Sequence, residues 1–198
     1  MALEENFHEI TAVTLLNLAI LHSAREETGP AKEAFEKCIK YAEQVGALSV
    51  KAKALVNLAA FEAEHSNLAE AERINDSAVA ILDSLSDDHN KTFLFITVGQ
   101  TYQALMQAQS PSKNGLLRRS HDAYQTSIDI AEGIGSNRGL SYALGNMGHL
   151  YEAIGRIDEA FSLTQRAIFA AQQAGARESQ YKGHWQSGRM ERGRGNTE

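Results

Sequence analysis

Small and apolar residues recur along the chain at a spacing of about forty positions. One small residue returns with gaps of 40, 40, 49 and 40 positions, at Ala19, Ala59, Gly99, Gly148 and Gly188. A second returns with gaps of 40, 49 and 40 positions, at Ala31, Ala71, Ser120 and Ala160. Self-similarity of this length is typical of solenoids, whose units bury their apolar faces by stacking on their neighbours. The pattern predicts four repeats and the first half of a fifth.

Within each repeat the apolar positions have helical spacing. In the second repeat Leu55, Leu58 and Ala59 lie at i, i+3 and i+4, which places them on one face of a helix. The second half of the same repeat continues with Ala71 and Ala78. Because small residues in both halves let two helices approach closely, each repeat is predicted to be an antiparallel helix pair. The fold class is therefore all-α, a solenoid of helix hairpins.

The helix ends are marked by residues that stand fifteen positions after the second small residue, at Gly46, Ser86, Gly135 and Gly175. Glycine readily adopts the left-handed conformation that ends many helices. We predict helices over 8–26, 30–45, 49–65, 68–85, 89–109, 112–134, 138–154, 158–174 and 178–193. They form one domain over 1–198, with repeats at 8–47, 48–87, 88–136 and 137–176 and a half-repeat at 177–195.

The nine extra residues of the third repeat fall near 107–115. This segment contains Ser110, Pro111, Asn114 and Gly115, which cap helices and form turns. It predicts longer helices in the third hairpin, joined by a protruding loop. Two interpretations stay open, a partner-specific contact and a tolerated surface insertion.

The fourth repeat resembles a tetratricopeptide repeat. The family's small residues match Gly148, Ala160 and Ala167, its tyrosine matches Tyr151, and its turn glycine matches Gly155. The other repeats match less fully, since Glu26 and Ser66 stand at the turn position and Glu62 replaces the tyrosine. A tetratricopeptide unit normally has about 34 residues. The resemblance implies a right-handed solenoid that binds proteins or peptides.

The forty-residue period is similar to that of Pins-like polarity scaffolds, bacterial peptide-receptor regulators and caspase-like CHAT-domain proteins. The stretch 142–195 most resembles the repeats that precede a CHAT protease-like domain. That resemblance implies a regulatory arm of a larger effector, with its protease-like domain beyond residue 198. The alternative is that the half-repeat caps the solenoid.

In the tetratricopeptide family the first helix of each pair lines the concave face. The residue two positions before the first small residue then faces the groove, and it is polar in every repeat: Asn17, Asn57, Thr97, Asn146 and Gln186. Side-chain amides can pair with both the N–H and the C=O of an extended peptide. The remaining groove residues that we predict are Leu16, Ile20, Lys53, Val56, Phe93, Ile96, Gln100, Tyr142, His149 and Trp185. The apolar and aromatic ones among them would form side-chain pockets along a peptide-binding groove.

Three alternatives to peptide capture stay open. One is that asparagine is simply tolerated in a crowded repeat position, and another is that the chain is a signalling-peptide or small-molecule receptor with a closed pocket. The solenoid ends could also pair copies of the chain, because terminal repeats must cover their apolar faces. A basic clamp for a terminal carboxylate is not expected: Lys53 is on the groove side, but Leu16, Val56, Ile96 and Gly145 occupy the repeat position where such a clamp would need lysine.

Composition narrows the class of function. With 43% apolar residues and a net charge of −6, the chain suits a cytoplasmic scaffold and not a nucleic-acid or membrane partner. Its single cysteine, Cys38, occupies a position that is Ala or Ser in the other repeats, so it is predicted to be a buried thiol. Seven scattered histidines offer no metal-ligand spacing. The segment 133–139 has the wrong spacing for a phosphate loop. We therefore expect no catalysis, cofactor or metal.

Overall fold

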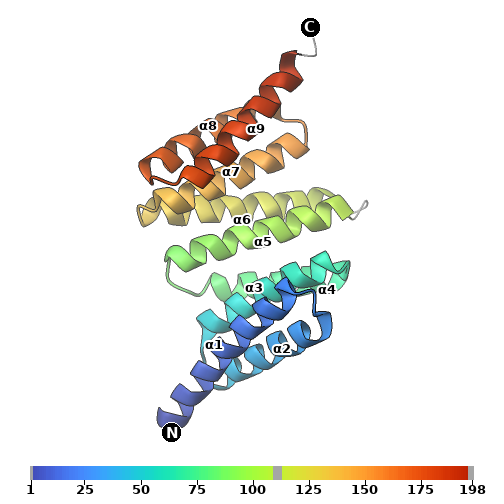
Figure 1. The fold of residues 1–198 in the computed structure, drawn as a ribbon, viewed down its shortest axis with the longest axis vertical. Coiled ribbons are helices and arrows are strands. Elements are labelled where there is room, and N and C mark those ends of the chain that lie inside the picture. The colour runs from blue at the N-terminus through green and yellow to red at the C-terminus, as the bar shows by residue number, and fades with distance from the viewer. Residues whose placement is uncertain (1, 109–112, 196–198) are drawn as a thin grey trace. The chain divides into compact units, whose positions relative to one another are not determined.

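The structure is a computed structural model that describes residues 2–108 and 113–195. In this part of the chain nine helices follow one another and no strand occurs (Figure 1). Their bounds are α1 Ala2–Ala24, α2 Thr28–Gln44, α3 Leu48–Glu64, α4 Leu68–Leu82, α5 His89–Ala108, α6 Lys113–Gly133, α7 Asn137–Ala153, α8 Ile157–Gln173 and α9 Arg177–Gly195. The predicted all-α architecture of helix hairpins is confirmed, and most of the predicted helix bounds lie within two residues of the observed ones.

The helices divide into two compact units, Met1–Leu85 and Ser86–Glu198. The first unit contains the hairpins α1/α2 and α3/α4, and the second contains α5/α6, α7/α8 and the unpaired α9. Within each unit the second helix of one hairpin packs against the first helix of the next, as α2 does on α3 and α8 on α9. The first helices also touch one another, α1 with α3, and α7 with both α5 and α9.

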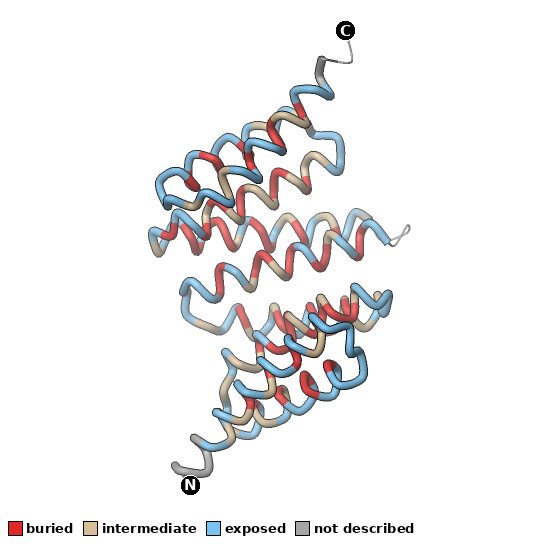
Figure 2. Tube along the Cα trace, viewed as in Figure 1, coloured by how far each residue is buried: buried red, intermediate tan, exposed pale blue. Residues whose placement is uncertain are grey.

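The small residues of the repeat lie where two helices meet. Ala19, Ala31, Ala59 and Ala71 have no exposed surface. In the third hairpin Ser120 donates a buried hydrogen bond of 2.9 Å to the carbonyl of Gly99. Figure 2 shows buried residues alternating with exposed ones along the helices, which is the pattern of helices with one buried face. Close approach of small residues therefore defines each hairpin.

The hairpin turns explain the weaker copies of the repeat. Glu26 and Ser66 have φ values of 61° and 63°, close to the 81° of Gly155 at the same position of the fourth repeat. The first two repeats thus keep the turn geometry without the glycine. Glu26 and Ser66 adopt a left-handed backbone that is strained for residues with a Cβ atom. Between repeats Gly46, Gly135 and Gly175 supply the left-handed residue.

Two helix bounds differ from the sequence-based expectation. Helix α1 begins at Ala2 and not at residue 8, so the polar start of the chain continues the helix. Helix α4 ends at Leu82, because Asp83 caps it in a right-handed conformation and the chain leaves the helix before Ser86. The extra residues lengthen α5 and α6 to 20 and 21 residues, as predicted, against 17 in α7 and α8. The loop expected within 107–115 falls partly on 109–112, outside the described residues.

Candidate functional site

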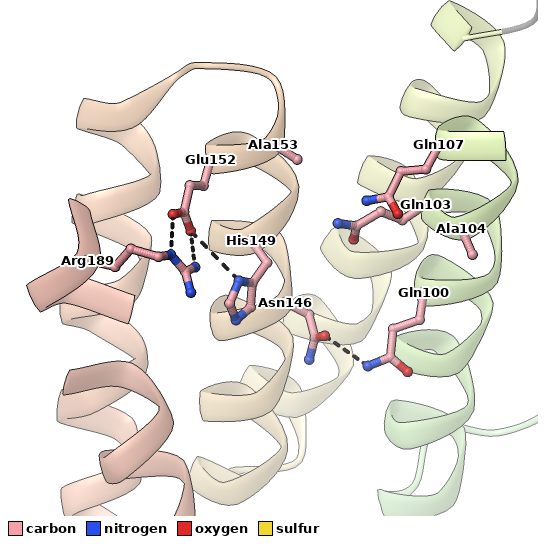
Figure 3. Close-up of a pocket in the computed structure, with 9 residues that line it drawn as sticks. All are labelled: Gln100, Gln103, Ala104, Gln107, Asn146, His149, Glu152, Ala153 and Arg189. Carbon is pink, nitrogen blue, oxygen red and sulfur yellow. Dashed lines mark hydrogen bonds and ion pairs between the residues drawn. The ribbon is translucent and has the colours of Figure 1, made fainter. Parts of the chain in front are cut away.

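In the second unit the first helices α5, α7 and α9 line an open cleft of about 660 Å³. The side chains that line it come from all three helices: Gln100, Gln103, Ala104, Gln107, Asn146, His149, Glu152, Ala153 and Arg189. Figure 3 shows Gln103 and Gln107 reaching from α5 toward α7, with Arg189 on the far side of Glu152. The cleft therefore combines amides from α5 with a charged pair that joins α7 to α9.

The amide groups of this cleft are held in place. Gln100 donates from Nε2 to Oδ1 of Asn146 over 2.9 Å, which connects α5 to α7 (Figure 3). Asn146 in turn donates from Nδ2 to the carbonyl of Tyr142 over 2.8 Å. Gln103 accepts a hydrogen bond of 3.0 Å from the hydroxyl of Tyr124. These contacts fix the side chains before a ligand arrives, which lowers the entropy lost on binding.

The charged groups of the cleft neutralise each other. Arg189 donates from Nε and Nη2 to the two carboxylate oxygens of Glu152, over 2.8 and 2.6 Å. This bidentate pairing lowers the pKa of Glu152, although partial burial opposes it. Burial, and secondly the charge of Arg189, lower the pKa of His149, so its imidazole is neutral at pH 7. The cleft therefore presents hydrogen-bonding groups and almost no net charge.

A second hollow of about 570 Å³ lies at the start of α5 and α7. It is lined by His89, Phe93, Ser136, Arg138 and Tyr142. The rings of Phe93 and Tyr142 meet edge to face, with centroids 5.7 Å apart. The ammonium of Lys182 lies 5.8 Å from the centre of the Tyr142 ring. An aromatic side chain would find apolar and cationic contacts here.

The structure brings together only part of the predicted groove. Gln100, Asn146 and His149 line the amide cleft, and Phe93 and Tyr142 line the aromatic hollow. Trp185 is 63% exposed on α9, and the guanidinium of Arg189 lies 4.4 Å from its ring centre. In the first unit Asn17, Ile20 and Lys53 are exposed on α1 and α3, and Asn57 is half-buried.

Four predicted groove residues are buried instead. Leu16, Val56 and Ile96 are at most 5% exposed, because the residue three positions before the small residue lies on the face that packs on the second helix of its own hairpin. Gln186 is 1% exposed, since its amide fills the space that Gly148 leaves open on α7. These side chains contribute to packing and offer no surface to a ligand in this structure.

The polar row itself is largely used within the helices. Asn57 donates to the carbonyl of Lys53 over 2.7 Å, Asn146 to that of Tyr142, and Thr97 to that of Phe93 over 3.2 Å. Each bond runs to the carbonyl four residues earlier, a common way for polar side chains to be satisfied inside a helix. Thr97 therefore has its hydroxyl donor occupied, and each asparagine has one of its two amide donors occupied, so the glutamines of α5 offer more free amide groups.

Sequence reasoning missed Gln103, Gln107 and Arg189. The two glutamines could have been found with Gln100, because positions 100, 103 and 107 lie on one face of a helix. The pairing of Glu152 with Arg189 carries no such local signal, since the residues are 37 positions apart on different helices.

Other kinds of site are not found in the described parts of the chain. No three His, Cys, Asp or Glu side chains of these residues are grouped as metal ligands would be. No helix among them is long and apolar enough to cross a membrane. Cys38 is buried as predicted, and burial raises the pKa of its thiol to about 11, which makes it unreactive at neutral pH.

Comparison with known proteins supports the tetratricopeptide class. The family model for the tetratricopeptide repeat matches residues 11–45, which contain most of the first hairpin. Among solved structures, the chain is similar to BtubC (BKLC) from P. vanneervenii, with a TM-score of 0.70 and 13% sequence identity. That match covers 96% of this chain and 82% of BtubC, and at this identity it shows the fold alone. No curated protein matches the chain in sequence.

Proposed function

We propose that the chain is a non-catalytic protein-interaction scaffold whose second unit binds an extended peptide segment in the cleft between α5, α7 and α9. The observation that carries this proposal is the set of amide side chains, Gln100, Gln103, Gln107 and Asn146, which share one cleft of about 660 Å³. Tetratricopeptide repeats, whose family model matches residues 11–45, are typical of protein-interaction scaffolds. The similarity to the fold of BtubC supports the helical-repeat architecture.

An extended peptide suits the chemistry of this cleft. Each primary amide has two donors and an acceptor, and a peptide backbone presents one N–H and one C=O per residue. Gln103 and Gln107 lie one helical turn apart, about 6 Å along α5, which is close to the length of two extended residues. Successive glutamines can therefore reach the backbone groups of alternate peptide residues.

The ion pair that Arg189 makes with Glu152 indicates which peptide ligands the cleft would not favour. Its guanidinium is already bonded to both oxygens of Glu152, so a terminal carboxylate would have to displace that partner. A neutral backbone segment requires no such exchange. We therefore expect internal peptide segments to bind in preference to free C-terminal tails.

Peptide selection with a matched variant tests the proposal. A displayed library of peptides is selected on the wild type, and the affinities of the selected peptides are measured for Gln103→Ala/Gln107→Ala and for the control Gln125→Ala/Gln172→Ala. The control removes two exposed glutamines from α6 and α8, away from the cleft. Loss of two hydrogen bonds weakens binding about tenfold in the first variant and leaves the control unchanged. Equal affinities for both variants, or no selected peptide, would contradict the proposal.

A further inference from the structure

Helix α1 carries a row of apolar side chains that no other described helix covers. Phe7 is 67% exposed, Ile10 59%, Leu18 40% and Leu21 48%, with the exposed Thr14 at the centre of the row. These five positions follow the three- and four-residue spacing of one helix face. A contiguous apolar row of this kind on a protein surface indicates an interaction site.

The same row is buried in later first helices of both units. In α3 it corresponds to Ala54, Leu58 and Phe61, all at most 5% exposed, and the Phe61 ring lies 6.0 Å from that of Phe35 on α2. In α7 the equivalent Ala143, Met147 and Leu150 are at most 3% exposed.

The unpaired α9 has the same arrangement. Gly183, the α9 residue at the repeat position of Thr14, lies against Ile168 of the preceding helix α8. This face is therefore the one on which a preceding helix packs, and in α1 it is built of larger apolar residues.

We propose that two copies of this chain pair through α1, with the helices antiparallel and Thr14 at the two-fold axis. The row is symmetric about Thr14, since Ile10 and Leu18 each lie four residues away, and Phe7 and Leu21 each lie seven residues away. In an antiparallel pair with Thr14 at the axis, two residues face each other when their numbers add to 28. Phe7 then packs on Leu21 and Ile10 on Leu18, with the small Thr14 side chains where the helices cross.

The chemistry of the row fits such a self-complementary contact. A two-fold interface places the same surface of both copies in contact, so a symmetric pattern matches itself without further change. No charged residue interrupts the row, and the hydroxyl of Thr14 already donates to the carbonyl of Ile10 over 2.8 Å. Burial of Thr14 would therefore leave no unpaired hydroxyl donor. Antiparallel helices also bring opposite ends of their dipoles together.

The oligomeric state in solution tests the contact. We expect a monomer–dimer equilibrium in sedimentation velocity over a concentration series, with a dissociation constant in the micromolar range because one helix pair makes a small interface. Ile10→Lys and Leu18→Lys abolish the dimer. The control Phe169→Lys replaces another exposed apolar residue, 63% exposed on α8, and leaves the equilibrium unchanged. A wild type that stays monomeric at every concentration, or a dimer that survives both lysine variants, overturns the proposal.

Disulfide trapping tests the antiparallel arrangement separately. Thr14→Cys is expected to form a covalent dimer under mild oxidation, because this position meets itself at the axis. Ile10→Cys and Leu18→Cys are each expected to stay monomeric, but a mixture of the two forms a dimer. Cys38 is fully buried and does not interfere. Covalent dimers of Ile10→Cys alone would indicate a parallel pair and refute the arrangement. The contact lies in the first unit, so its failure leaves the peptide cleft of the second unit unaffected.

Discussion

Replacement of Gly99 by alanine provides the sharpest test of how the hairpins are packed. A Cβ atom at this position would lie 2.5 Å from the nearest ring carbon of Tyr124 on α6. Tyr124 has no exposed surface, and its hydroxyl is bonded to Gln103, so the ring has no free space into which to turn. The added methyl group must therefore push α5 and α6 apart.

The expected magnitude follows from two opposing effects. Overpacking of a tight core costs about 1–3 kcal/mol. Alanine in place of glycine within a helix gains about 1 kcal/mol in helix propensity. We therefore expect Gly99→Ala to lower the free energy of unfolding by up to about 2 kcal/mol. Gly145→Ala is the matched control in α7, because its Cβ meets only the Ala167 Cβ at 3.9 Å, and it should raise stability.

Urea unfolding measures both changes. Trp185 is the single tryptophan and lies in the second unit with both glycines, so its fluorescence follows the unfolding of that unit. The double variant Gly99→Ala/Tyr124→Thr introduces the residue that the fourth repeat has at the position of Tyr124. It should be less destabilised than the sum of its single changes, since the clash is removed. A Gly99→Ala protein that gains as much stability as Gly145→Ala would refute the packing argument.

Three further outcomes follow from the structure. Glu26→Gly and Ser66→Gly should each raise the free energy of unfolding by about 0.5–1 kcal/mol in thermal unfolding, because glycine adopts the left-handed backbone there without strain. The control Ala47→Gly, at a φ of −76°, should not raise it. Lys32→Ala should destabilise by about 1–3 kcal/mol in urea unfolding, since it leaves the 1% exposed carboxylate of Glu62 without its cation 2.7 Å away. Lys37→Ala, which breaks a solvent-exposed ion pair with Glu33, should leave the stability almost unchanged. Finally, Arg189 lowers the pKa of Glu152 in the folded protein below the ordinary carboxyl value of 4.5. The stabilisation from this ion pair is therefore fully present above pH 4.5 and is lost as the pH falls through the pKa of the folded state. The stability difference between wild type and Arg189→Met should therefore narrow below pH 4.5, and a difference that stays constant down to pH 2 would contradict it.

Most of the helices could be predicted because their signals are local. The repeated small residues and the glycines between repeats fix where helices pair and end, and these patterns are visible in one turn of helix or one loop. The same reasoning failed at α4, where Ser86 suggested an end that the chain reaches at Leu82. Asp83 caps the helix without a left-handed residue, so no glycine signal exists there.

The candidate site was only partly predictable, because burial depends on neighbouring helices. Asn146 and His149, two of the predicted groove residues, line the cleft to which α5, α7 and α9 contribute. Val56 and Gln186 were also predicted for the groove from their positions in the repeat, but both are buried. Val56 packs within its own hairpin, and the Gln186 amide fills the space that Gly148 leaves open. A one-dimensional period cannot distinguish a position that faces solvent from one that faces the next helix.

The sequence by itself determined the helical class, the repeat length and the close contacts within each hairpin, because these depend on residue size and spacing along the chain. Only the tertiary structure decided that Arg189 holds Glu152, that the glutamines of α5 meet Asn146, and that α1 leaves an apolar row uncovered. Each of these results from side chains on different helices being brought within a few ångströms, or from a helix face that no described helix covers. Such distances are set by how hairpins pack on one another, which the spacing of residues does not encode.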